Sequence, residues 1–279
     1  MERPQEIRAD FVNQVERPER AIDLARTALL VAAESDPNVD VDGTLHTIDT
    51  WAKDLRARLE PDMNNLQKLA RLRRFLFDEL GFRGDRKDYY NPSNSLLHEV
   101  ILRRRGIPLT LSILFMELGW RVGIPFEGVG FPGRFLVRLA GEPGDLLLDP
   151  FQRGMSVHEE DCRRILQEVT GGKLEFREEL LVSVSKRDMI ARLLYNLKVA
   201  CLKINDDERA LSAIDRLLLL HPDDAVERRD RGLLHYKLDH YRPARADLRA
   251  YLKLRPDALD REVIDRHLSA IEMMLAGLG

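Results

Sequence analysis

The chain has 279 residues, of which 44% are hydrophobic and 33% charged, and its formal net charge at pH 7 is -3. These values are typical of a soluble globular protein with one or two domains. They exclude a small disulfide-stapled scaffold and a membrane-spanning chain, and they give no general reason to expect nucleic acid or an anionic lipid surface as a partner.

Cysteine use and the first residues indicate the compartment. The chain holds only Cys162 and Cys201, too few for a framework of disulfides or zinc ligands. Its first six residues contain no apolar core of the signal-peptide kind. We therefore expect a cytoplasmic protein that uses no membrane partner and no cofactor.

Three helices are predicted in the first ninety residues, because apolar residues recur there at spacings of three and four. They cover residues 21–29, 45–59 and 66–76, and Pro61 and Gly81 end the second and third. Two further helices are predicted after the turn at 91–94, one from Leu96 to Gly106 and one from Leu109 to Val122. Gly123 then stands where a left-handed C-terminal cap is expected.

Strand signals begin at Phe126. The segments 126–131, 134–139 and 145–149 are short, apolar and separated by glycine and proline. Ser156 and Glu159 have the spacing of a capping box, which predicts a helix through Val169. The first part of the chain is therefore predicted to be an α+β domain with helices and a small antiparallel sheet.

An internal repeat dominates the last third of the chain. Ala210 and Ala244 are 34 residues apart, as are Pro222 and Pro256, and 34 residues is the period of a tetratricopeptide repeat. Gly232 supplies the small residue that the second repeat needs for close helix packing.

The first repeat has Lys198 at the position of that glycine, so it matches the pattern less well. The final apolar stretch predicts a helix that covers the open face of the second repeat. Its residues are Val263, Leu268, Ile271, Met274 and Leu275.

Several spaced motifs carry a resemblance to a known family. They are Arg105-Gly-Ile-Pro-Leu-Thr-Leu-Ser112, Gly123-Ile-Pro125, the segment 128–138 (GVGFPGRFLVR) and Leu148-Asp-Pro150. With the repeat period, they make the chain resemble the SirB family, in which a transglutaminase-like domain precedes tetratricopeptide repeats. The resemblance implies a transglutaminase-like, papain-like core in residues 1–185 and an all-helical repeat region in 186–279.

The resemblance also implies where a catalytic triad would stand. In the wider fold a Cys begins a helix, a His lies on a strand and an Asp lies on the next strand. These positions fall at Pro108, Arg134 and Asp149. Proline has no nucleophile, and an Arg with a pKa above roughly 12 is no base near neutrality. We therefore expect a relic triad without catalysis.

A hairpin register follows if 140–143 form a four-residue loop. Leu139 then faces Gly144, Arg138 faces Asp145 and Arg134 faces Asp149. This register predicts a guanidinium-to-carboxylate contact of about 4 Å or less between Arg134 and Asp149.

Two alternative functions remain open. Thr110 or Ser112 with His98 as a displaced base would make a peptidase, amidase or transglutaminase-like transferase with an unorthodox nucleophile. A basic face built from Arg71, Arg73, Arg74 and residues 103–105 would make a regulator that binds nucleic acid directly. We favour capping and packing for the hydroxyls and a solvated, ion-paired surface for the arginines.

No metal site is expected, because the ligand-type residues His158, Asp161 and Cys162 have no second cluster to join. The favoured function is a non-catalytic interaction or regulatory protein that binds a protein or peptide in the repeat groove. The SirB name also implies an association with the regulation of gene expression in bacteria. The sequence leaves the partner and the oligomeric state open.

Overall fold

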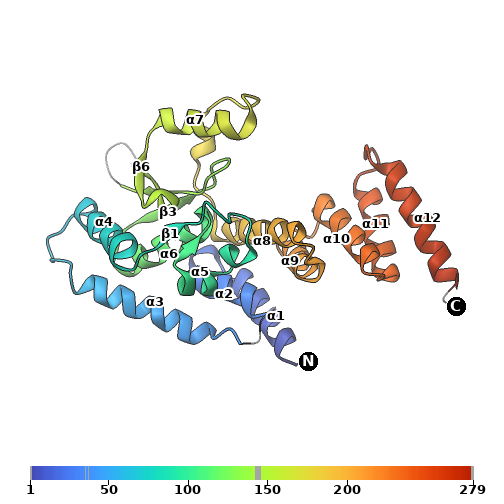
Figure 1. Cartoon of the computed structure of the whole chain (residues 1–279), viewed down its shortest axis with the longest axis horizontal. Helices are drawn as coiled ribbons and strands as arrows, with labels where there is room; N and C mark the ends of the chain where they lie inside the picture. Colours follow the sequence, from blue (N-terminus) through green and yellow to red (C-terminus); the bar gives the residue numbers. More distant parts are fainter. Residues whose placement is uncertain (1, 35, 37, 142–145, 278–279) are drawn as a thin grey trace. The chain divides into compact units, whose positions relative to one another are not determined.

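A computed structural model describes residues 2–34, 36, 38–141 and 146–277. The chain forms two compact units, Met1–Leu193 and Leu194–Gly279. The structure confirms the predicted combination of a helical N-terminal part, a small antiparallel sheet and a helical repeat region (Figure 1). None of the described helices is both long and apolar enough to cross a membrane.

Helices make up the start of the first unit, as predicted. They are α1 (Glu2–Val15), the 3-10 turn η1 (Glu19–Ala21), α2 (Leu24–Ala33), α3 (Val41–Arg56) and α4 (Asn65–Arg73), which continues as the π-helical turn η2 (Arg74–Glu79). Asp23, Asp40 and Asn64 cap α2, α3 and α4 by accepting a hydrogen bond from a backbone N–H in the first turn.

The two central helices follow the 3-10 turn η3 (Pro92–Ser95). They are α5 (Leu97–Arg103) and α6 (Pro108–Arg121), and Gly123 after α6 is left-handed, with φ 79°, as predicted. The prediction that the shorter helix continues to Gly106 is wrong, because Arg104 adopts φ 57° and ends it. Gly106 instead belongs to the two-residue strand β2 (Arg105–Gly106), which pairs in parallel with β1 (Arg83–Gly84).

A four-stranded antiparallel sheet lies between two helices of the first unit. Its strands, in spatial order, are β3 (Phe126–Val129), β4 (Leu136–Leu139), β5 (Leu146–Asp149) and β6 (Met155–Val157). Helix α6 contacts β3 and β4, whereas α7 (Glu159–Thr170) packs Cys162, Ile165 and Leu166 against Leu136 and Leu147 (Figure 1). Both faces of the sheet are therefore covered.

Strand β6 corrects the predicted start of α7. Ser156 lies within β6, so it cannot form the capping box predicted with Glu159. The N-cap is His158, whose backbone N–H donates to the Asp161 carboxylate over 3.1 Å. The capping pattern was present in the sequence two residues later than predicted.

The predicted hairpin register is also wrong, by two residues. Val137 pairs with Leu148, Arg138 with Leu147 and Leu139 with Leu146. The predicted partners Gly144 and Asp145 lie outside the described residues. Because side chains alternate with a period of two, a two-residue shift leaves every side chain on its predicted face of the sheet.

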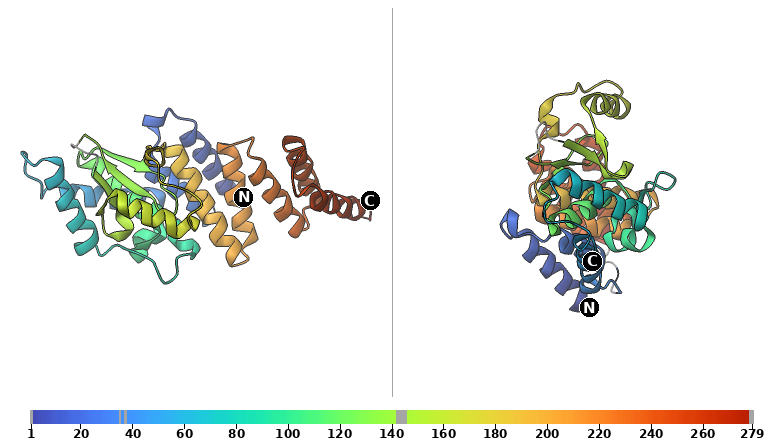
Figure 2. Two further views of the ribbon diagram at one scale, coloured as in Figure 1. Left: turned by 90° about the horizontal axis from the view of Figure 1, so that it is seen from above. Right: turned by 90° about the vertical axis from the view of Figure 1, so that its left-hand side faces the viewer.

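The second unit consists of helical hairpins. The 3-10 turns η4 (Pro150–Gln152) and η5 (Glu178–Leu181) precede α8 (Lys186–Lys203), which contains the boundary between the units. Helices α9 (Asp207–Leu220), α10 (Ala225–Lys237), α11 (Tyr241–Leu254) and α12 (Arg261–Gly277) follow, each beside the next (Figure 2). Helix α10 packs on both α9 and α11, and α12 packs on α11.

The covering face of α12 differs in part from the predicted stripe. Ile264 and Ile271 are buried against α11, with Leu268 and Leu275 packed beside them. Val263 and Met274 are exposed, contrary to the prediction. The spacing of residues 264, 268, 271 and 275 follows the helical period more closely, so these side chains share one stripe.

The repeat signature residues lie at buried helix positions and in the turns between helices. Ala210 and Ala244 are fully buried, whereas Pro222 and Pro256 lie in the turns after α9 and α11. A Cβ placed on Gly232 would lie 2.8 Å from Leu248 Cδ2, so a side chain there would force Leu248 to shift. Glycine therefore permits the close packing of α10 on α11.

Candidate functional site

The three triad positions that the family resemblance implies lie on elements that contact one another. Pro108 is the buried first residue of α6, Arg134 precedes β4, and Asp149 is the last residue of β5. Helix α6 contacts both β4 and η4, the turn that follows β5. One turn further along α6, Ser112 donates a hydrogen bond to the carbonyl of Phe135, next to Arg134, over 3.3 Å.

Asp149 is fully buried, and its carboxylate is occupied by local donors. It accepts hydrogen bonds from the backbone N–H groups of Phe151, at 2.9 Å, and Gln152, at 3.4 Å. The side-chain amide of Gln152 donates to its second oxygen over 3.1 Å. Asp149 therefore caps η4, a structural task for a carboxylate.

Arg134 makes the predicted contact with Asp149, although the register that led to it is wrong. Its Nε lies 3.7 Å from Asp149 Oδ2, within the predicted limit. This Nε is buried and has no hydrogen-bond partner among the described residues. The pair is therefore an electrostatic contact and not a bidentate hydrogen-bonded bridge.

Aromatic and cationic groups surround Arg134. Its guanidinium carbon lies 5.5 Å from the centre of the Phe151 ring, which in turn lies 6.2 Å from the ring of Tyr89. Burial raises the pKa of the Tyr89 hydroxyl, and the charges of Arg134 and Arg192 oppose that rise. Arg192 Nη2 donates to the carbonyls of Phe131 and Arg134 and thereby fixes the turn that carries Arg134.

The alternative nucleophiles are engaged with the backbone. Thr110 Oγ1 is buried, accepts from the Ile107 N–H at 3.1 Å and lies 2.8 Å from the Asn94 carbonyl, to which it donates. Ser112 is likewise buried. Burial lowers the pKa of His98, and within the described chain no hydrogen bond joins its ring to Thr110 or Ser112. Nucleophile and base therefore do not meet as an activated pair.

The cysteines have the surroundings of core residues. Cys162 and Cys201 are both buried and free. Burial raises the pKa of Cys162, and it raises the pKa of Cys201 to about 11. Both thiols are therefore protonated near neutrality and poorly nucleophilic. Among the residues that the structure describes, no group of His, Cys, Asp and Glu could hold a metal ion.

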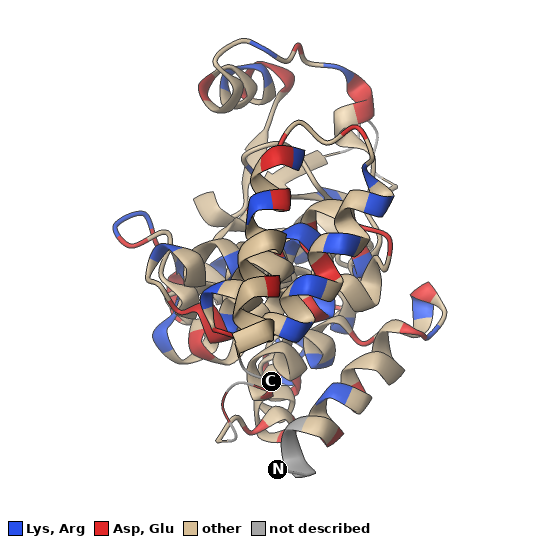
Figure 3. Ribbon diagram, turned by 90° about the vertical axis from the view of Figure 1, so that its right-hand side faces the viewer, with Lys and Arg blue, Asp and Glu red and all other residues tan. Residues whose placement is uncertain are grey.

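The predicted run of basic residues is divided by the fold. Arg104 stacks over the rings of Trp51 and Phe82, at 4.5 and 4.7 Å, and burial lowers its pKa. Arg103 lies 3.4 Å from the Asp85 carboxylate. Lys and Arg are also interspersed with Asp and Glu along the ribbon (Figure 3). The guanidinium groups of Arg103 and Arg104 are thus engaged in contacts within the first unit.

Sequence reasoning missed an ionic cluster in the second unit. Lys198, which mismatched the repeat pattern, is 3% exposed, and its Nζ lies 2.7 Å from both Glu227 Oε2 and Asp230 Oδ2. Burial opposes the charge of Lys198, but hydrogen bonds to Asp230 and Glu227 outweigh it and raise its pKa. The sequence signal for this cluster was Lys198 itself, which stands at a repeat position that favours a small residue.

We expect Asp149→Ala to destabilise the first unit by about 1–3 kcal/mol, because the N–H groups of Phe151 and Gln152 lose their acceptor. Arg134→Gln is expected to cost less than about 1 kcal/mol, since its contact is long and its side chain partly exposed. Denaturant midpoints of the two variants measure the difference. A larger cost for Arg134→Gln would show that the ion pair, and not the cap, holds this turn.

Comparison with known proteins gives matches over most of the chain. Residues 43–195 match the family described as Transglutaminase-like superfamily, and residues 197–275 match a tetratricopeptide repeat family. A UPF0162 protein of Xylella fastidiosa strain 9a5c is 34% identical over 253 residues, which cover 90% of each chain. No solved structure is significantly similar.

Two further relatives show the range of the similarity. A UPF0162 protein of Pseudomonas aeruginosa is 32% identical over 248 residues, covering 89% of this chain and 90% of the relative. The human F-box only protein 21 is 34% identical over 142 residues, which cover 44% of this chain and 23% of that protein. The similarity thus extends to a protein of quite different length.

Proposed function

Because this chain belongs to the transglutaminase-like superfamily and to the UPF0162 proteins, we propose that it is a non-catalytic interaction or regulatory protein. The superfamily domain supplies a rigid scaffold, and the tetratricopeptide repeats supply the binding surface for a protein or peptide. The proposal includes a boundary between the two domains at residues 185 and 186 and membership of the SirB family. It also places the protein in a bacterial cytoplasm. Two buried free cysteines suit a reducing compartment.

The observation that carries the proposal is the chemistry of residues 108 and 134. Pro108 offers no nucleophile and no backbone donor, and Arg134 offers no base. Two further observations support it: the carboxylate of Asp149 accepts hydrogen bonds from Phe151 and Gln152, and the hydroxyl of Thr110 is engaged with backbone groups. A domain that lacks a nucleophile and a base but retains its fold can still bind a protein or peptide.

The proposed binding surface is tested by paired variants. Tyr195 and Val226 are exposed apolar residues on α8 and α10, the first helices of the two repeats, whereas Leu219 and Leu254 are exposed on the second helices, α9 and α11. Two double variants are compared by partner capture from the native cell, quantified by mass spectrometry. The first combines Tyr195→Ala and Val226→Ala, and the second combines Leu219→Ala and Leu254→Ala.

We expect a stoichiometric partner to be lost from the first double variant and retained by the second, because in this proposal the first helices line the concave surface that stacked repeats form. Equal retention by both double variants would contradict binding through that face. Circular dichroism of each variant shows whether its helices are intact.

A turnover assay separates this proposal from the enzyme alternative. The full chain is incubated with a glutamine-containing peptide and a fluorescent primary amine, and both hydrolysis and transfer are followed. We expect no turnover above buffer. Turnover that is lost in Thr110→Val, Ser112→Ala or His98→Gln would establish an unorthodox nucleophile and overturn the proposal.

A further inference from the structure

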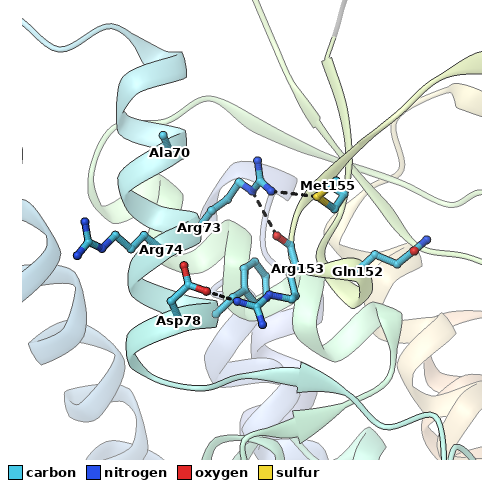
Figure 4. A pocket seen from close by; sticks show the side chains of 8 residues that line it. Ala70, Arg73, Arg74, Asp78, Gln152, Arg153 and Met155 are labelled. Atoms are coloured by element: carbon cyan, nitrogen blue, oxygen red, sulfur yellow. Dashed lines mark hydrogen bonds and ion pairs between the residues drawn. The ribbon is translucent and has the colours of Figure 1, made fainter.

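A pocket of about 270 Å³ lies between a helix and the strand edge of the first unit (Figure 4). One wall comes from α4 and η2, and the other from η4 and the start of β6. The lining residues are Ala70, Arg73, Arg74, Phe77, Asp78, Gln152, Arg153 and Met155.

Two arginines cross between these walls. Arg73 Nε donates to the carbonyl of Arg153 over 3.2 Å, and its Nη2 lies 3.3 Å from the sulfur of Met155 (Figure 4). In the other direction, the Arg153 guanidinium pairs with Asp78. Both acceptors of Arg73 are neutral, and within the described residues it has no carboxylate partner. Neither of these contacts neutralises the positive charge of Arg73.

The surface around the pocket carries an excess of positive charge. A neighbouring pocket of about 220 Å³ is lined by Arg58, Arg71, Arg74 and Glu79, with Leu55 and Phe75. Glu79 pairs with Arg58 and lies 3.7 Å from Arg74. Five arginines and two carboxylates thus line the two pockets. The resulting excess of positive charge attracts anions to the two pockets.

Local backbone geometry lets the two walls of the pocket approach closely. Arg153 and Gly154 adopt φ 60° and 66°, and a Cβ on Gly154 would lie 3.2 Å from Arg73 Cγ and 3.3 Å from the Phe77 ring. The opposite wall is a π-helical turn, in which the Leu80 N–H donates to the Phe75 carbonyl over 2.9 Å. Turns of this kind are frequent at functional sites.

We propose that this pocket binds the phosphate monoester of a small organic molecule. A guanidinium presents a planar fork of donors that matches phosphate oxygens, and a dianion suits an excess of positive charge. Phe77 and Met155 provide an apolar wall for the organic part, and a volume of about 270 Å³ suits a small molecule. This inference is independent of the function proposed above.

Calorimetric titration of the full chain with phenyl phosphate, at fixed ionic strength, tests the proposal. We expect saturable binding at one site. Arg153→Asn and Arg73→Met are each expected to weaken it by at least about tenfold, because each removes a charge-assisted donor. Asparagine suits the left-handed backbone at 153, so the first variant should remain folded. The control Arg71→Gln, on the same helix but outside this pocket, should stay within about twofold.

A charge-neutral variant distinguishes contact from net charge. The double variant Arg153→Asn with Asp78→Asn leaves the net charge unchanged, and it should still bind phenyl phosphate at least about tenfold more weakly. Binding as tight as in the parent chain would overturn the role of the Arg153 guanidinium.

Three further outcomes would overturn the proposal. They are no saturable binding of phenyl phosphate, equally tight binding of benzoate, and tighter binding of a single-stranded oligonucleotide that depends on Arg71 as much as on Arg153. The last outcome would instead support the nucleic-acid alternative.

Discussion

Lys198→Met is expected to lower the free energy of unfolding by about 3–5 kcal/mol, the cost of breaking a buried ion pair from one side. Methionine has a similar length, so the loss of packing is small. What the variant loses is the cation that compensates Glu227, which is 6% exposed, and Asp230. A buried carboxylate without a partner is costly because it has left water without gaining an equivalent interaction.

The matched control is Lys237→Met. Lys237 pairs with Asp207 at 2.6 Å in the same unit, but its side chain is 54% exposed. Exposed pairs contribute about 0–1 kcal/mol, so chemical denaturation followed by circular dichroism should separate the two variants clearly. Equal costs would contradict the assignment of the Lys198 cluster as a buried electrostatic anchor.

The cost of Lys198→Met should also depend on pH. Burial raises the pKa of Glu227 in the folded protein, and the Lys198 hydrogen bond opposes that rise. Without the lysine the folded-state pKa rises further, so the penalty is present above the unfolded pKa of glutamate and shrinks as the pH falls toward it. We therefore expect a smaller difference between variant and parent at pH 4.5 than at pH 7.

Removal of the covering helix is expected to unfold the second repeat. A chain that ends after Pro256 lacks α12 and uncovers the apolar face of α11, whose buried members are Ala244, Leu248 and Tyr251. Each buried isoleucine that is lost removes about 1.5–3 kcal/mol of burial. The truncated chain should therefore melt at a lower temperature than the full chain.

Two point variants test the same face without truncation. Ile271 is fully buried, so Ile271→Ala should cost about 2–5 kcal/mol. Met273 is 70% exposed on the same helix, so Met273→Ala should stay within about 0.5 kcal/mol. A truncation or an Ile271→Ala variant that melts like the parent would show that α12 is dispensable.

Much of the fold could be predicted because the signals are local. Gly123 ends α6 by its left-handed conformation, and the 34-residue spacing of Ala210 and Ala244 places both on buried helix faces. The hairpin register could not be predicted, because it depends on a loop length that Gly141 and Pro143 mark but do not define. The contact between Arg134 and Asp149 was nevertheless predicted, because an error of two residues preserves the face.

The pocket lined by Arg73 and Arg153 was less predictable than the triad region, because it joins residues far apart in sequence. Arg73 and Arg153 are 80 residues apart, and no local pattern indicates that their side chains cross the same pocket. Lys198 illustrates the opposite case. A pattern flagged it as a mismatch, but only its long-range partners Glu227 and Asp230 reveal that it forms a buried ionic cluster.

The Lys198 cluster also makes the two successive helix interfaces of the repeat region chemically distinct. One period later, the positions of Lys198, Glu227 and Asp230 are occupied by Gly232, Arg261 and Ile264. Ionic partners in the first interface thus correspond to a glycine and a buried isoleucine in the second. If α8 packed against α12 in place of α10, Lys198 would face Arg261 and Ile264. Such mispairing is costly, so the cluster fixes the order in which the repeats assemble.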